Sequence, residues 1–438
     1  MLEEKLIAGT PPATSAPMSR ALVVAGLFVL ASLLLMDLAA GRLDAPPVHH
    51  LLHQWMSRDA QDDSWGPMIR AYDWLQAPHQ TTLYQDVFFT QHVKFQYPPT
   101  SLLPLAAMHA LGVEPTVPGL NLANFLIFAL LALANAVFAV VLARRARQIP
   151  REALLPSLVV AGVAGVATAA FYPVIWSYVL GQAQTAIDLA FTLACLCWVS
   201  GRRAAAGVLI GAICLLKPQF GLFLIWGAFR RQWPFLIGWG AVVLPGLALS
   251  VALFGLANHL DYLATLQFLS SHGEVFYPNQ SVNGLLNRLL QNGDSVNWSG
   301  TSFPPYRPLV YFGTLLSSAA LILAAFFLRG RQADRGGLLD FMTAALTFTI
   351  ASPIAWEHHY GILPAIFLAL LFALLSARPS AGRGGFWAAL TASYVLSANF
   401  FPLANEAATT PFNFVQSYLL LGGLVALWLL YRVPAPAP

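Results

Sequence analysis

The chain has 438 residues, 58% of them hydrophobic and only 10% charged, and its mean hydropathy is +0.64. So few polar residues cannot cover the outside of a water-soluble fold, which excludes a soluble globular protein. The formal net charge of +4 is small and spread between turns, so no nucleic-acid partner is indicated. Apolar runs recur that approach the roughly 20 residues a helix needs to cross a bilayer, which predicts an all-α, polytopic membrane protein.

The N-terminal 40 residues are interpreted as a cytoplasmic tail, 1–20, followed by a first span, 21–40. The apolar run is longer than the core of a signal peptide and lacks the usual basic start, so we expect the chain to retain it.

Residues 46–99 form the long polar interruption of the first half. Gly66-Pro67 indicates a helix start, since proline at the first helical position loses no needed N–H. Apolar residues then recur at helical spacing as far as Leu75, which predicts a short amphipathic helix that ends before Pro78. Asp62 and Asp63 precede this helix, where its dipole favours the ionised carboxylate that a general base needs. Solvation and capping of a surface helix explain the two aspartates equally well. The other aspartates of this loop are Asp59, Asp73 and Asp86.

Beyond this loop the apolar runs predict nine further complete spans. They cover 120–143, 153–176, 182–199, 234–254, 309–327, 338–354, 360–376, 387–400 and 418–431. Residues 100–112 are too short to cross, so we expect them to dip in without a net crossing. Residues 204–229 have basic residues at both ends and Lys217-Pro218 in the middle, which predicts a hairpin of two half-spans with Lys217 at its apex.

Arginine clusters fall at every second connection, which marks those turns as cytoplasmic. They are Arg144, Arg145, Arg147 and Arg151; Arg202 and Arg203; Arg230 and Arg231; Arg329, Arg331 and Arg335; Arg378 and Arg383; and Arg432. We therefore predict one integral-membrane domain, 21–432, with a first outer loop at 46–99, a second at 255–307, and a cytoplasmic C-terminal tail at 433–438. The turns near Gly181 and at 356–359 and the segment 403–411 then also face outside.

Ionisable residues within spans are functional candidates because burying them is costly. Lys217 can meet the phosphate of a lipid-anchored substrate, or pair internally with Asp188 or Asp340. His358 and His359 can hydrogen-bond a phosphate or sugar hydroxyls, or simply pack at the interface. Adjacent residues on a helix point about 100° apart, so no metal site is predicted from this pair.

Amide side chains collect in the outward segments, at Gln182, Asn279 and Gln280, together with the guanidinium of Arg288. Aromatic residues accompany them, including Tyr97. This combination suits carbohydrate, although polar loops with aromatic belts are normal in membrane proteins. The cysteines lie in apolar runs and are interpreted as small core residues: Cys195, Cys197 and Cys214.

The order of these motifs resembles glycosyltransferase family 87, the polyprenyl-phosphate-mannose-dependent mannosyltransferases of the GT-C superfamily. The resemblance rests on the acidic first loop, Phe95-Gln96-Tyr97-Pro98-Pro99, Gly181-Gln182, Leu216-Lys217-Pro218, Asn279-Gln280-Ser281 with Arg288, and Ser352-Pro353 with His358-His359. It implies transfer of a sugar, most often mannose, from a polyprenyl-phosphate donor to a lipid or polysaccharide acceptor at the outer face. It assigns the first-loop base to Asp63, with Asp62 in reserve.

The expected reaction is an inverting, metal-independent transfer without a cofactor, in the plasma (inner) membrane with the site facing the outside or periplasm. We expect Lys217, Arg288 and His359 to stabilise the leaving phosphate. Other candidates for donor binding are His358, Gln182, Asn279, Gln280, Tyr97 and Lys94. Membrane lipids are the remaining partners. The alternatives are a pentosyl (arabinofuranosyl-type) transferase of the same fold, and a lipid-glycan flippase or transporter in which Lys217 and Asp188 gate a pathway.

Overall fold

The computed structural model describes residues 61–433, apart from 151, 301, 329–334 and 378–382. The expected tail at 1–20, the first span at 21–40, Asp59 and all but the first residue of the C-terminal tail lie outside the described residues. Within the described part, regular structure is helical apart from one antiparallel bridge between Asn279 and Trp356. This confirms the all-α prediction.

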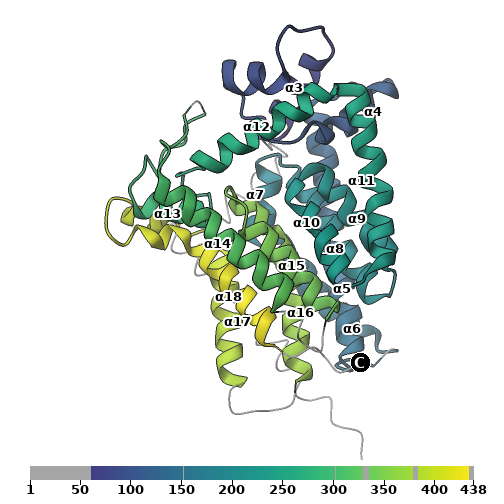
Figure 1. The fold of residues 1–438 in the computed structure, drawn as a ribbon. Coiled ribbons are helices and arrows are strands. Elements are labelled where there is room, and N and C mark those ends of the chain that lie inside the picture. Colours follow the sequence, from purple (N-terminus) through teal and green to yellow (C-terminus); the bar gives the residue numbers. More distant parts are fainter. Residues whose placement is uncertain (1–60, 151, 301, 329–334, 378–382, 434–438) are drawn as a thin grey trace, which may run out of the picture.

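Most helices follow one another with short connections, and longer segments separate α3 from α4, α13 from α14 and α17 from α18 (Figure 1). In chain order they are α3 (Trp65–Leu75), α4 (Leu103–Ala110), α5 (Val117–Arg145), α6 (Leu154–Ala169), α7 (Tyr172–Val179), α8 (Gln184–Val199), α9 (Arg203–Leu216), α10 (Leu222–Phe229), α11 (Trp233–Phe254), α12 (Leu256–His272), α13 (Val282–Leu289), α14 (Pro308–Phe327), α15 (Leu338–Ile350), α16 (Leu363–Ser376), α17 (Arg383–Ala398) and α18 (Tyr418–Arg432). Short 3₁₀ turns cover Pro99–Leu102, Pro218–Gly221, Glu357–Ile362, Pro402–Ala407 and Asn413–Ser417, and a π turn covers Tyr84–Thr90.

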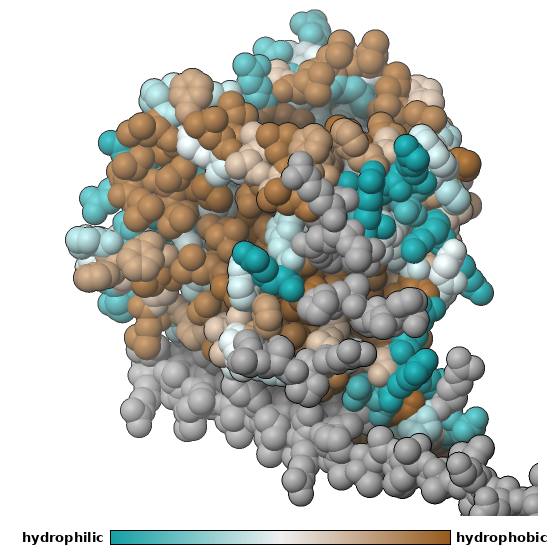
Figure 2. All heavy atoms as spheres, turned by 60° about the horizontal axis from the view of Figure 1, so that its bottom comes forward, coloured by the Kyte–Doolittle hydropathy of each residue, from teal (hydrophilic) through white to brown (hydrophobic). Residues whose placement is uncertain are grey.

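Five helical stretches of the described chain are long and apolar enough to cross a membrane, and six if α6 and α7 form one bent span. Their outer surfaces are apolar, as on α5, where exposed Leu122, Leu126, Leu130 and Leu133 repeat at helical spacing. Figure 2, which brings the lower end of Figure 1 forward, shows hydrophobic residues over much of the described surface. The chain is therefore a multi-pass membrane protein. The five stretches are Val117–Arg145, Trp233–Phe254, Pro308–Phe327, Glu357–Ser376 and Asn413–Arg432.

Four predicted spans differ from the structure. Those at 182–199, 338–354 and 387–400 correspond to helices of 16, 13 and 16 residues, which are shorter than the five stretches that can cross. The expectation of one continuous span at 153–176 is wrong, because α6 and α7 meet at a 55° bend. Pro173 lies in the first turn of α7 and has no N–H to continue the ladder from α6. The short segment after the first loop consists of a 3₁₀ turn and the eight-residue α4, which lies beside α3 at the top of Figure 1. An eight-residue helix is roughly 12 Å long, too short to cross.

The predicted hairpin is present. Helix α9 ends at Leu216, Lys217 is extended, and α10 runs back. Trp226 near the end of α10 therefore contacts Trp198, which precedes α9 at the end of α8, with ring centroids 5.6 Å apart. At the other end the carbonyl of Leu215 accepts a 2.5 Å hydrogen bond from Thr100, just after the first loop.

The second outer loop contains α12 and α13 and braces the first loop. Asn258 on α12 accepts a 2.8 Å hydrogen bond from the backbone N–H of Leu83. Asp261 accepts from the N–H groups of Tyr84 and Gln85 at 3.0 and 3.1 Å. The first loop is also tied to α5, since the indole of Trp65 donates to Asn121 at 2.9 Å. These contacts hold α3 in place above the helices, at the top of Figure 1.

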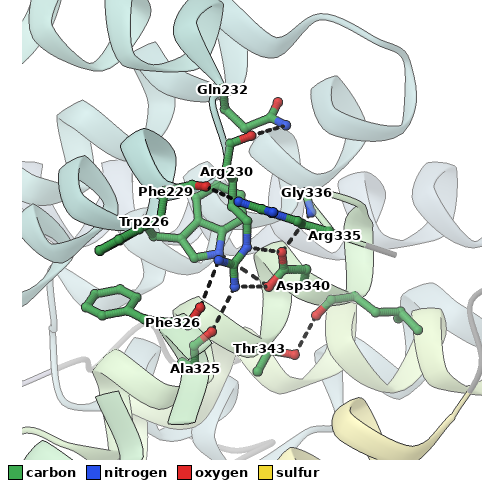
Figure 3. A network of polar contacts seen from close by, with 11 residues as sticks. Trp226, Phe229, Arg230, Gln232, Ala325, Phe326, Arg335, Gly336, Asp340 and Thr343 are labelled. Carbon is green, nitrogen blue, oxygen red and sulfur yellow. Dashed lines mark hydrogen bonds and ion pairs between the residues drawn. The ribbon is translucent and has the colours of Figure 1, made fainter. Parts of the chain in front are cut away.

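The opposite end carries a buried ion pair (Figure 3). Arg230, after α10, donates to Asp340 of α15 at 2.6 and 3.2 Å, and both side chains are almost fully buried. The same guanidinium donates to the carbonyls of Ala325 and Phe326, each at 2.9 Å, at the end of α14. Arg335 donates to Phe229 at 2.6 Å. This cluster joins the helical hairpin to α14 and α15 at the arginine-bearing end.

Candidate active site

The segment that carries the candidate base lies along the turn after α7. The backbone N–H groups of Gln61, Asp63 and Ser64 donate to the carbonyls of residues 179, 180 and 181 at 2.8, 2.9 and 3.2 Å. Gly181 has a φ of +66°, and a Cβ on it would collide with the carbonyl of Gln61. Glycine is therefore required there for both the backbone angle and the close approach.

Gln182 is the centre of a polar cluster with Asp63, Ser64 and Tyr97. Its Nε2 donates a short hydrogen bond to Asp63 Oδ2. Its Oε1 accepts from Ser64 Oγ at 2.6 Å and from Tyr97 Oη at 2.9 Å. Because hydroxyls can donate to the amide oxygen and a carboxylate can only accept, this arrangement fixes the amide orientation. The cluster thus directs one N–H at Asp63.

Asp63 and Asp62 differ in these contacts. Both side chains reach solvent, but Gln182 bonds Asp63, whereas the Asp62 carboxylate lies toward Gly66 of α3. Partial loss of water around its carboxylate raises the pKa of Asp63 above the ordinary range. The hydrogen bond from Gln182 lowers that pKa, and the charges of Asp62 and Lys94 act in opposite directions. The structure therefore separates the two aspartates that the sequence left as near equivalents.

Tyr97 connects this cluster to Lys217 at the hairpin apex. Lys217 Nζ lies 5.3 Å from the centroid of the Tyr97 ring. It also lies 2.6 Å from Nε2 of His359. Five of the candidate site residues are thereby brought together from the first loop, the turn before α8, the hairpin and the turn before α16: Asp63, Gln182, Tyr97, Lys217 and His359.

The turn Glu357–Ile362, called here the histidine turn, is held in place by the buried carboxylate of Glu357. Glu357 accepts hydrogen bonds from the hydroxyls of Tyr172 on α7 and Tyr418 on α18 at 2.8 and 2.9 Å. The rings of His358 and His359 meet edge to face with centroids 4.7 Å apart. Within the described chain, Nδ1 of His359 is buried without a hydrogen-bond partner. One ring nitrogen of His359 is therefore left unsatisfied by the described protein groups.

The side chains of Asn279, Gln280 and Arg288 bond mainly to backbone groups. Asn279 donates to the carbonyl of Glu274 at 2.8 Å and accepts from the N–H of Ala355 at 3.0 Å. Gln280 donates to the carbonyls of residues 277 and 416 at 2.6 and 2.7 Å. Arg288 donates to backbone carbonyls, including that of Asn279, and to one serine hydroxyl. These residues fasten the second outer loop to the histidine turn.

Lys94 joins the two outer loops. Its Nζ lies 3.2 Å from Glu274 and sits over the rings of Trp298 and Phe303, 3.9 and 4.3 Å from their centroids. Burial lowers the pKa of Lys94, and the charge of Glu274 opposes this effect. The ammonium is therefore already engaged by protein groups, whereas the sequence suggested that it binds donor.

Comparison with known families matches residues 95–353 to glycosyltransferase family 87. The chain belongs to glycosyltransferase family 87. This match contains Tyr97, Gln182 and Lys217, while Asp63 precedes it and His359 follows it. No curated protein and no solved structure matches the chain. Family membership makes the protein a membrane glycosyltransferase, with a sugar donor and an acceptor as its substrates.

The internal ion pairs considered for Lys217 are not formed in this family 87 protein. Asp340 pairs with Arg230 instead. Asp188 accepts a 2.8 Å hydrogen bond from Gln184, and its other oxygen lies buried toward Gly361. Among the described residues, no ion pair joins Lys217 to either aspartate.

Three residues that contact or adjoin candidate site residues were not assigned a role from the sequence: Ser64, Glu274 and Glu357. Ser64 directly follows Asp63, and Glu357 directly precedes His358, so adjacency to a candidate was the available signal. Glu274 had none, because its partner Lys94 lies 180 residues away in the chain.

Proposed function

We propose that this family 87 glycosyltransferase moves a sugar from a polyprenyl-phosphate donor to an acceptor hydroxyl with inversion, using Asp63 as general base. The observation that carries the proposal is the continuous cluster from Asp63 through Gln182 and Tyr97 to Lys217 and His359. It places a carboxylate on one side of Tyr97 and nitrogen groups on the other. The family resemblance favours mannose as the sugar and a lipid or polysaccharide as the acceptor.

In the proposed step, Asp63 takes the proton of the acceptor hydroxyl as its oxygen bonds to the anomeric carbon. The bond from that carbon to the phosphate oxygen breaks, and its electron pair leaves with the polyprenyl phosphate. Water loss around Asp63 raises its pKa, which makes its carboxylate a stronger base than a freely solvated one.

Lys217 and His359 supply the stabilisation that the departing phosphate needs. Their nitrogens lie 2.6 Å apart, and Nδ1 of His359 is buried with no partner in the described chain. Donors fixed where negative charge develops lower the barrier more than mobile water does. A phosphate that bonds both residues would satisfy the pair with charge-assisted hydrogen bonds.

The test is radiolabelled transfer in proteoliposomes from polyprenyl-phosphate mannose. The Asp63→Asn protein should lose about 10²–10⁴-fold in turnover, because it keeps the size of the side chain but removes the base. Asp73→Asn is the matched control, since Asp73 is exposed on α3. Inversion is checked by NMR of the product.

Three results would contradict this proposal. Asp63→Asn could keep most activity while Asp62→Asn loses it, which would move the base. Transfer could occur from polyprenyl-phosphate arabinose alone, which would make the enzyme a pentosyltransferase. The labelled sugar could cross the membrane without any covalent product, which would favour a flippase.

A further inference from the structure

A cavity lies in the outer loops, and none of the residues of the Asp63 cluster lines it. It has a volume of about 450 Å³, within the range of small-molecule sites in proteins. Its wall comes from the chain after α13 and from the segment after α17, two segments more than 100 residues apart. The charged residues that line it are Arg288 and Asp294, and the neutral polar ones are Gln291, Ser295, Asn297 and Thr409.

The lining can both donate and accept hydrogen bonds without a net positive charge. Within the described structure, the side chains of Gln291, Ser295 and Thr409 make no hydrogen bond to protein. Asp294 accepts from the N–H groups of Val296 and Asn297 at 2.8 and 3.0 Å, and these bonds keep its pKa low. The amide of Asn297 donates to the other oxygen of Asp294 at 2.8 Å. The guanidinium of Arg288 balances the charge of Asp294, so the lining is neutral overall. The free amide of Gln291 and the free hydroxyls of Ser295 and Thr409 suit a neutral ligand rich in hydroxyl groups.

The cavity adjoins the first loop through Trp298. This half-exposed tryptophan directly follows Asn297, and Lys94 of the first loop lies over its ring at 3.9 Å. Tyr97, three residues after Lys94 in the chain, donates to Gln182 at 2.9 Å and so belongs to the Asp63 cluster. A chain of sugars that filled the cavity could therefore pass the tryptophan on its way to the candidate base, and aromatic faces beside hydroxyl-binding groups suit such a chain.

We propose that this cavity is an acceptor subsite, which binds a neutral sugar unit of a glycan acceptor beyond the hydroxyl that reacts. The proposal rests on the proposed transfer reaction and adds a substrate class to it. The acceptor is then an oligosaccharide, either free or linked to a lipid. One of its sugar units is bound by Gln291, Ser295, Asn297 and Thr409.

The experiment measures binding and transfer with octyl mannotrioside and octyl mannoside. Thr409→Phe fills the cavity. The double variant Thr409→Val with Gln291→Asn removes one hydroxyl and shortens the side chain that carries the amide by one methylene. Asparagine tolerates the positive φ of 49° at position 291. Each protein should raise the Kd and KM for octyl mannotrioside by about tenfold, and change the values for octyl mannoside by less than twofold.

Thr81→Val is the control, because Thr81 is exposed on the first loop, far along the chain from the cavity. Thermal melting in detergent checks that the variants are folded. Unchanged mannotrioside affinity in both cavity variants overturns the subsite, as does equal loss for the two glycosides. The wild-type protein could instead bind mannotrioside at the cavity but neither transfer nor hydrolyse the polyprenyl-phosphate donor. That result would support the cavity as a glycan site and contradict the proposed reaction.

Discussion

Gln182 links the two hydroxyls of Ser64 and Tyr97 to the carboxylate of Asp63 through a single amide. The hydroxyl donors occupy its oxygen, so its N–H must point at Asp63. We infer that Gln182 positions the base and does not bind the donor sugar directly. Its hydrogen bond therefore lowers the pKa of Asp63, and removing that bond should raise this pKa.

Gln182→Met keeps the length of the side chain and removes the N–H that lowers the pKa of Asp63. The base must be ionised to work, so activity falls as the pH drops through this pKa. The variant should therefore move the acid limb of the kcat/KM profile to higher pH. Tyr97→Phe, which leaves the amide N–H in place, should move it less. An acid limb at the wild-type pH in Gln182→Met would refute the positioning role.

Lys217→Met removes the ammonium at the hairpin apex and keeps an apolar side chain of similar length. If Lys217 meets the leaving phosphate, transfer should fall by about 10²-fold or more, while the protein still inserts and folds. The measurement is transfer at saturating acceptor and matched membrane abundance. Recovery of activity when Asp188→Asn is added would show instead that the lysine only balances a buried carboxylate.

At the scale of helices, the arginine-bearing end depends on Arg230. Its guanidinium reaches Asp340 and the end of α14 in one network (Figure 3). Arg230→Met leaves the Asp340 carboxylate buried without its cation, which should cost about 3–5 kcal/mol. Melting of the purified protein should show this loss, and the double variant Arg230→Met with Asp340→Leu should recover part of it. A single variant as stable as wild type would show that the pair is not needed.

Features encoded by neighbouring residues could be predicted from the sequence, and contacts between distant residues could not. The α3 helix and the hairpin were predictable, because Gly66-Pro67 and the Lys217-Pro218 break are encoded at the sites where they act. Asn279 and Arg288 were predicted to bind donor, and their many backbone partners were not foreseen. Those partners lie up to 76 residues away from Asn279, so no local pattern records them. Gln182 was also predicted to bind donor, and its partners on the first loop are 85, 118 and 119 residues distant.

For the whole molecule, the candidate site and the arginine cluster occupy opposite ends of the helices, as the alternation of charged turns suggested. Only an impermeant label tests which end faces outward. In a background with Cys197→Ala and Cys214→Ala, Gln85→Cys on the first loop should react in intact cells, and Arg145→Cys should react only after lysis. The reverse pattern would place the site on the cytoplasmic side.

The hairpin of α9 and α10 also affects how this protein is built into the membrane. A segment that enters and returns on the same side adds two apolar helices without reversing the direction of the chain. Deleting it should therefore leave the sidedness of every later segment unchanged, as reporter enzymes fused after α8 and after α11 can record. The hairpin is therefore needed for the candidate site but not for membrane insertion. Its loss removes Lys217 from the site and leaves the later spans correctly oriented.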